Sequence, residues 1–172
     1  MEIRKWFAEI NRRVSALEKG SIQEHRDVIE MDLILPKENI DGLRFNEQKV
    51  HAVFDKHDDG WYYSRDILFL SARNYKSDNS RDILMEYLNN HESYGSIKAQ
   101  IAAMMSIECI MDIEISLPEE NEGIKEYNGV KWWYWRRAAV SSGFRGVSFN
   151  GGNYNTYAHS VGGVAPTFCI RS

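Results

Sequence analysis

The segment from Asp112 to Ile170 decides the expected fold of this chain. It reads DIEISLPEENE at 112–122, KWWYWRRAAVSSGFRGVSF at 131–149 and GGVAPTFCI at 162–170. An acidic loop precedes a cluster of tryptophan and arginine, and two short strand-like runs at 144–150 and 154–161 are joined by Gly151-Gly152. Glycine supplies the positive φ that a tight hairpin turn needs. The segment therefore predicts a C-terminal β-hairpin framed by loops.

Three motifs in this segment occur, in the same order, in one protein family. LPEENE at 117–122 looks like that family's LPSExE loop, WYWRR at 133–137 looks like its WWLRS, and GGVAPTF at 162–168 looks like its closing GVRPAF. On these motifs the chain resembles C-type-lectin-like domains of the branch that contains sulfatase-modifying factors and the variable proteins of diversity-generating retroelements. That branch also includes lectin-like domains of gut bacteria and their phages. The likeness is close over the C-terminal third and loose over 45–170.

The resemblance implies an α+β fold, namely a C-type-lectin-like domain with small antiparallel sheets and two helices, preceded here by an N-terminal amphipathic helix. We expect an N-terminal helix for oligomerisation or docking at 1–20, a connector with a short strand at 21–44, and the lectin-like domain at 45–172. A length of 172 residues suits one domain with an appendage.

Residues 2–18 are expected to form the N-terminal helix, ending near Gly20. Its apolar residues recur at alternating spacings of three and four, the pattern of a coiled-coil seam. A helix this short is marginal in water by itself and has to pack on something. Two partners stay open: identical chains, with a homotrimer favoured, or the chain's own domain or the surface of a host particle. The seam residues are Ile3, Phe7, Ile10, Val14 and Leu17.

Patterns in the middle of the chain predict further elements. Residues 28–36 alternate partly and stop at a proline, which indicates a strand. Residues 50–63 contain an Asp-Gly pair between two apolar runs and predict a hairpin. Helices are expected at 80–90 and 97–105, with Ser80 and Ser96 as their N-caps. Histidine and aspartate near the turn at 57–60 are more typical of turn chemistry than of a metal site, so no metal is predicted.

The C-terminal hairpin is the candidate ligand-binding surface. Trp133 and Trp135 are expected in the core because large aromatic side chains dominate cores. Val147 and Phe149 are expected to point inward, which leaves polar and aromatic residues outside, the composition of a binding surface. The alternative is an ordinary loop-rich polar surface. The candidate ligand-binding residues are Arg137, Phe144, Arg145, Ser148, Asn150, Asn153, Tyr154, Asn155, Tyr157 and His159.

Catalysis is not expected. No nucleophile–base set is visible, and no Gly-rich phosphate loop has the strand–loop–helix context that it needs. Family members that oxidise sulfatase cysteines carry a close cysteine pair near the C-terminus, whereas only Cys169 lies there in this chain. The Glu-Pro-Asn and Trp-Asn-Asp motifs that hold calcium in animal lectins of this fold are absent. We therefore expect neither an enzyme nor a cofactor.

The composition of the chain limits the kinds of partner that we expect for it. A net charge of −4 argues against non-specific nucleic-acid binding, which needs a basic surface. No apolar run approaches the length of a membrane span, and no signal peptide is recognised. Cys109 and Cys169 have no metal-ligand or disulfide spacing and are expected to be buried thiols. The chain is therefore expected to be made in a host cytoplasm.

Together with the resemblance, these features predict a phage virion protein: a fibre, tail or capsid-decoration protein at the virion surface. Its partners would be copies of itself, other virion proteins, and a host surface protein or glycan bound through the C-terminal hairpin. Two alternatives stay open. One is a purely structural or assembly virion protein, and the other is an intracellular inhibitor that acts by protein–protein contact.

Overall fold

The computed structural model of the protein describes residues 27–40, 43–76, 80–91 and 95–171. The predicted N-terminal helix, with its seam from Ile3 to Leu17, lies outside the described residues and stays a prediction. Within the described parts of the chain, no helix is long and apolar enough to cross a membrane.

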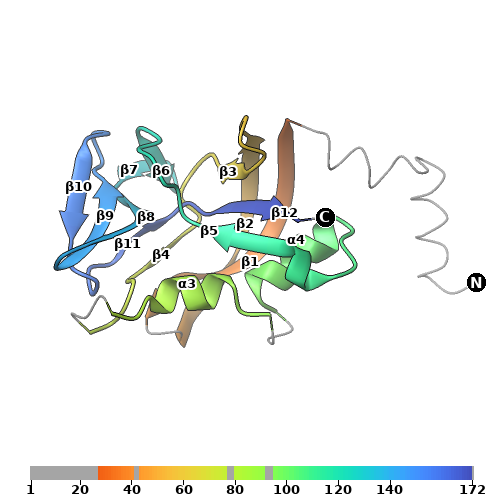
Figure 1. Cartoon of the computed structure of the whole chain (residues 1–172), viewed down its shortest axis with the longest axis horizontal. Coiled ribbons are helices and arrows are strands. Elements are labelled where there is room, and N and C mark those ends of the chain that lie inside the picture. The colour runs from red at the N-terminus through yellow and green to blue at the C-terminus, as the bar shows by residue number, and fades with distance from the viewer. Residues whose placement is uncertain (1–26, 41–42, 77–79, 92–94, 172) are drawn as a thin grey trace, which may run out of the picture.

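One large sheet dominates the structure (Figure 1). Its ten strands lie in the order β10-β9-β8-β11-β4-β1-β2-β3-β12-β5, and most neighbours are antiparallel. Two further strands, β6 and β7, pair only with each other. The strands are β1 (Val28–Ile40), β2 (Leu43–Lys56), β3 (Tyr62–Ser64), β4 (Phe69–Ser71), β5 (Ile113–Ser116), β6 (Lys125–Tyr127), β7 (Val130–Trp132), β8 (Tyr134–Val140), β9 (Gly143–Val147), β10 (Asn153–Thr156), β11 (Gly162–Val164) and β12 (Thr167–Ile170).

The predicted α+β fold with small antiparallel sheets is wrong. About 48% of the described residues are in strands and about 12% in helices, and a single sheet holds ten strands. The short strand expected within 21–44 is longer than predicted. It is β1, which has 13 residues and pairs along nearly its whole length with the 14-residue β2 to form a two-stranded ribbon.

The two halves of this ribbon differ in how clearly the sequence shows them. Along β1, Ile29, Met31, Leu33 and Leu35 are buried and the residues between them are exposed, which is the alternation of a half-buried strand. Most residues at 43–49 in β2 are exposed instead. A strand with neither face buried carries no hydrophobic period, so the sequence could not show it.

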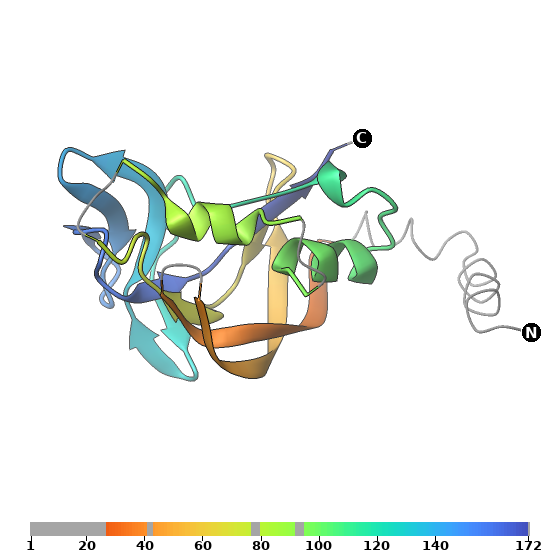
Figure 2. The same ribbon diagram turned by 90° about the horizontal axis from the view of Figure 1, so that it is seen from below.

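Two short helices cover one side of the sheet, and they stand in front of the strands in the view from below (Figure 2). α3 spans Ile83–Leu88 and α4 spans Ile97–Met104. Both lie within predicted helical segments. Ser96 caps α4 as predicted, because its hydroxyl accepts from the Ala99 N–H at 3.1 Å. α3 begins later than expected, since Asp82 rather than Ser80 is its N-cap.

The main hydrophobic core lies between these helices and the sheet. α4 packs against both β1 and β5, which are four strands apart in the sheet order, so the sheet curls around this helix. Phe168 on β12 is fully buried and makes ring contacts with Phe54 and Tyr62, at centroid distances of 5.0 and 4.9 Å. The cysteine prediction was wrong for Cys109, which is exposed, while Cys169 is half-buried.

Candidate functional site

The C-terminal hairpin forms one end of the sheet, opposite the end that carries β5 (Figure 1). β9 pairs with β10 so that Arg145 faces Asn155 and Gly146 faces Tyr154. Residues directly opposite each other share a face of the sheet. Arg145, Asn150 and the residues of β10 up to Asn155 are exposed, as are Tyr157 and His159 just beyond it. We call the exposed set, which covers both faces of β10, the hairpin surface: Arg145, Asn150, Asn153, Tyr154, Asn155, Tyr157 and His159.

The backbone beneath this surface is closely packed. The Trp133 ring lies against Tyr154 and against the buried Trp135, with centroids 5.3 and 4.8 Å away. A Cβ atom at Gly162 would overlap the Trp133 ring, so only glycine fits there. A Cβ atom at Gly143 would likewise overlap the carbonyl of Thr156 on β10. Trp135 is therefore in the core as predicted, whereas Trp133 is half-buried. Trp133 supports the hairpin from beneath through its contacts with Tyr154 and Gly162.

A fully buried arginine holds the strand next to the hairpin. Arg73, which is 0% exposed, donates to the carbonyls of Arg136 at 2.6 Å and Arg137 at 3.0 Å. It also binds the Asp82 carboxylate through two nitrogens. Both carbonyls lie where the pairing of β8 with β9 is interrupted, between Trp135 and Ala139. Arg73 thus satisfies the backbone groups that this irregularity releases from the sheet.

Two predicted positions on the hairpin are corrected. Phe144 was expected to contact a ligand, but it is 3% exposed and lies 4.0 Å beneath the Arg73 guanidinium, so it belongs to the core. Phe149 was expected to point inward and is 60% exposed. Val147 is buried as predicted. Ser148 is half-buried, and its hydroxyl hydrogen-bonds the side chain of Asn150 within the turn.

The acidic loop after β5 supports the tip of the hairpin. The Asn121 side-chain amide donates to the Gly151 carbonyl at 2.9 Å and to the Asn153 side-chain oxygen at 3.0 Å. The Arg136 side chain donates to the carbonyl of Glu119 and to the same oxygen of Asn153. The LPEENE motif is therefore a structural brace, and it fixes the side chain of one candidate ligand-binding residue, Asn153.

Arg137 is separated from the other candidates. Its side chain is 47% exposed, against 12% for Arg136. It pairs with Glu119. Both residues line a cavity of about 220 Å³ beside Trp61 and Tyr63, and none of the hairpin surface lines it. Arg137 therefore belongs to a different concave site.

A larger cavity of about 320 Å³ lies between the β1–β2 ribbon and the β6–β7 hairpin, where His51 and Arg65 form part of its wall. Their charges are already paired. Arg65 binds Asp55 through two nitrogens, at 2.7 and 3.1 Å. The His51 ring lies between Glu30 at 2.7 Å and Asp32 at 2.9 Å, and these two hydrogen bonds raise the pKa of His51 above its usual value. We assign no ligand to this cavity.

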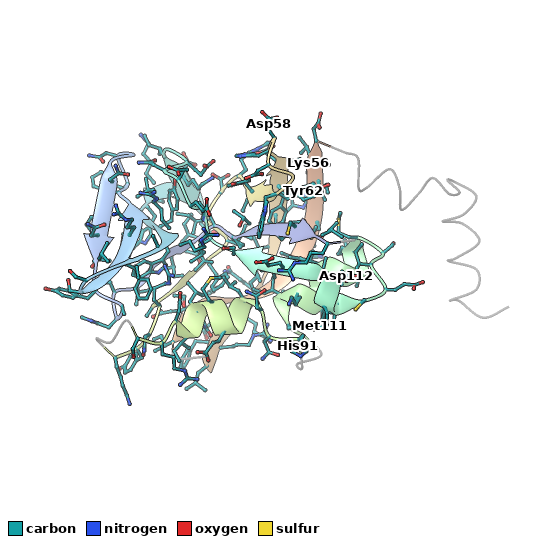
Figure 3. All side chains as sticks on the ribbon, in the orientation of Figure 1. Lys56, Asp58, Tyr62, His91, Met111 and Asp112 are labelled. Carbon is teal, nitrogen blue, oxygen red and sulfur yellow. The ribbon has the colours of Figure 1, made fainter. Side chains whose placement is uncertain are left out.

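Metal binding finds no support in the described part of the chain, where no group of three histidine, cysteine or carboxylate side chains converges. Gly60 has a φ of 85°, and its N–H donates to the His57 carbonyl at 3.0 Å, which makes this segment a tight turn. Asp58 stands at the outer tip of that turn (Figure 3).

Two important features of the structure could not be predicted from local sequence patterns. Arg73 is a single arginine two residues after a short strand, and no local pattern indicates its burial. The cavity lined by Trp61 and Tyr63 brings together residues from four distant segments. The residues that could have indicated this cavity are Trp61 and Tyr63, two aromatic residues that follow the Asp59-Gly60 turn.

Comparison with known proteins identifies no relative, because no family model, no curated protein and no solved structure matches the chain. The resemblance to C-type-lectin-like domains therefore rests on the three sequence motifs alone.

Proposed function

We propose that this chain is a non-enzymatic binding module that recognises a host surface protein or glycan through the hairpin surface. One observation carries the proposal: exposed polar and aromatic side chains stand on a backbone that is fixed from beneath. Tyrosine supplies contact area at a low cost in conformational entropy, and asparagine supplies adaptable hydrogen bonds. Tyr154 and Tyr157 are 40% and 57% exposed, beside the exposed Asn155 and His159.

Rigidity beneath the surface favours recognition over an ordinary loop-rich surface. A preformed binding surface loses little conformational freedom when its ligand binds. Trp133, the glycine contacts at Gly143 and Gly162, and the Asn121 brace all limit movement of the hairpin backbone.

Display on a phage virion stays a prediction that rests on the sequence resemblance. It requires many copies of the chain, whose combined binding would exceed the affinity of one copy. Light scattering of the full chain and of a chain that begins at Asp27 tests the copy number. We expect a trimer for the first and a monomer for the second. Monomers in both cases would remove the seam from Ile3 to Leu17 as an oligomerisation element.

The binding proposal is tested with the full chain, biotinylated and tetramerised on streptavidin so that weak contacts become measurable. The tetramer is applied to arrays of bacterial surface glycans and of purified envelope proteins. A triple variant, Asn155→Ala with Tyr157→Ala and His159→Ala, serves as the comparison. We expect specific binding by the natural chain and at least a tenfold loss in the triple variant, with an unchanged circular dichroism spectrum.

Two outcomes would reject the proposal. One is equal binding by the natural chain and the folded triple variant. The other is no specific binding to any array member, together with protection of the hairpin surface in an interface between copies of the chain. That second result would identify a structural subunit.

A further inference from the structure

The cavity beside Arg137 lies on the outer face of the sheet, where β3, β12 and β5 run side by side. Tyr63 faces Thr167, and Thr167 faces Ser116 in the next strand, so the three side chains form one row. Ser116 and Thr167 form the floor, and the aromatic walls are Trp61 and Tyr63. The rest of the lining is Asp59, Leu117 and the Glu119–Arg137 pair. The volume of about 220 Å³ equals about seven water molecules, at about 30 Å³ each. This is room for one large side chain.

The floor of this cavity holds a polar group that is open to it. Thr167 lines the cavity, and its hydroxyl makes no hydrogen bond to any described residue. The hydroxyl is not one of the buried side-chain groups that lack a partner, so solvent reaches it. A hydroxyl can both donate and accept, so it suits a polar ligand that reaches the floor.

The aromatic walls are held in place. The Tyr63 ring stacks on His57 with centroids 3.7 Å apart, and its hydroxyl donates to Asp59 at 2.7 Å. Asp59 also accepts from the Trp61 N–H at 2.9 Å. Burial, and then the Asp59 hydrogen bond, raise the pKa of Tyr63, so the phenol stays neutral over the physiological range. The walls therefore present fixed aromatic rings.

The charges of the lining favour a cation. Asp59 and Glu119 contribute two carboxylates against the single guanidinium of Arg137. Aromatic faces attract cations as well. Glu119 and Arg137 are 56% and 47% exposed, and an ion pair so open to solvent contributes little to stability. Glu119 can therefore exchange its partner for an incoming cation.

We propose that this cavity receives one basic side chain, lysine or arginine, of a partner protein. The apolar stem of that side chain would pack against Trp61 and Tyr63. Its charged head would donate to the Thr167 hydroxyl and to Glu119. The inference rests on the proposed function as a binding module, and it names a chemical feature of the partner that the hairpin surface does not define.

The test is a nuclear magnetic resonance titration of the full chain with N-acetyl-lysine amide and N-acetyl-arginine amide. N-acetyl-norleucine amide is the control probe, because it has a similar apolar stem without the charge. We expect the basic probes to shift the amide signals of Tyr63, Thr167 and Arg137 at millimolar concentration, and the neutral probe to leave them unchanged. Raising the salt concentration should weaken the binding, because it screens exposed charges.

Two variants sharpen the test. Glu119→Gln removes one charge at nearly constant shape, and Thr167→Val removes only the hydroxyl. Each should raise the dissociation constant of the basic probes about tenfold, because each removes one hydrogen-bond partner of the charged head. Thr156→Val, which deletes a hydroxyl from β10, is the matched control and should leave probe binding unchanged.

Three results would overturn the proposal. The first is equal binding of the neutral and basic probes, and the second is the absence of shifts at the highest soluble concentration. The third is a Thr167→Val variant that gains stability and binds the basic probes like the natural chain. The triple variant of the hairpin surface should keep probe binding, so the cavity and the hairpin proposals can fail separately.

Discussion

The two ends of the ten-stranded sheet are built differently. At the β5 end, the Asn89 side chain accepts from the Ile115 N–H at 2.9 Å and donates to its carbonyl at 2.6 Å, so an amide group takes the place of a further strand. At the β10 end, no described residue caps the outer edge in this way. Open edges are sites where other chains can pair, and proteins usually protect them. This protein therefore caps the sheet edge at β5 and leaves the edge at β10 open.

The same contrast holds for the side chains. In β5, Ile113 and Ile115 are 1% exposed and pack beneath the helices, whereas Asn153, Tyr154 and Asn155 of β10 are all exposed. We infer that the sealed β5 end provides stability and that the open β10 end is free to carry recognition.

The largest expected effect is at the sealed end. Phe168→Ala should lower the free energy of unfolding by about 3–5 kcal/mol, because it opens a cavity in a closely packed core. Tyr157→Ala at the open end should change it by no more than about 0.5 kcal/mol, as is usual for exposed positions. Urea unfolding followed by circular dichroism measures both. Similar losses in the two variants would mean that the open end also carries the stability of the fold.

Arg73 connects Asp82, the N-cap of α3, to the irregular part of β8. Loss of this side chain should lower the free energy of unfolding nearly as much as Phe168→Ala. Arg73→Met leaves the carbonyls of Arg136 and Arg137 and the Asp82 carboxylate without their donor. We expect a loss of about 3 kcal/mol, at the lower end for a broken buried pair because Asp82 is partly exposed. Hydrogen exchange should show the loss first in β8 and β9. An unchanged unfolding midpoint would show that Arg73 does not hold the irregularity in β8.

A matched pair of asparagines tests the edge comparison directly. Asn89→Ala leaves the backbone groups of Ile115 without partners, which should cost about 2 kcal/mol. Asn155→Ala on β10 removes an exposed side chain and should cost no more than about 0.5 kcal/mol. The unfolding free energies of the two variants show whether the Asn89 amide stabilises its edge of the sheet more than Asn155 does. Equal values would mean that the amide cap does not stabilise the β5 edge.

The smallest expected effect concerns pH. Hydrogen bonds to Glu30 and Asp32 raise the folded-state pKa of His51, so the protonated ring stabilises the ribbon. This contribution is fully present below the unfolded pKa, about 6.5, and is lost as the pH rises through the higher folded value. The titration of the His51 imidazole, followed by nuclear magnetic resonance, should give a pKa above the unfolded value of about 6.5. Glu30→Gln should lower it, and an unchanged value would contradict the assignment.

Some of the fold could be predicted from local patterns. The hairpin at 50–63, the Ser96 cap and the buried alternate residues of β1 each depend on residues close together in the sequence. The fold class could not, because it depends on how ten strands assemble. β1 lies beside β4, and β11 lies between β8 and β4, pairings that no local pattern encodes.

The candidate site divides in the same way. Exposure of Asn155, Tyr157 and His159 agrees with an outward-facing hairpin. Phe144 was misplaced because its inward direction is set by Arg73, a residue 71 positions earlier in the sequence that contacts its ring. Arg137 was misplaced because the irregularity in β8 turns it toward Glu119 and away from β10.

We infer that the β10 end of the sheet is rigid beneath its exposed side chains. Native-state amide hydrogen exchange of the full chain tests this rigidity by comparing β9 with β5. We predict that the amides of β9 exchange only through global unfolding, with free energies within about 1 kcal/mol of the Ile115 amide. Exchange of β9 through a local opening that leaves β5 protected would contradict the claim, because the hairpin surface would then stand on a mobile backbone.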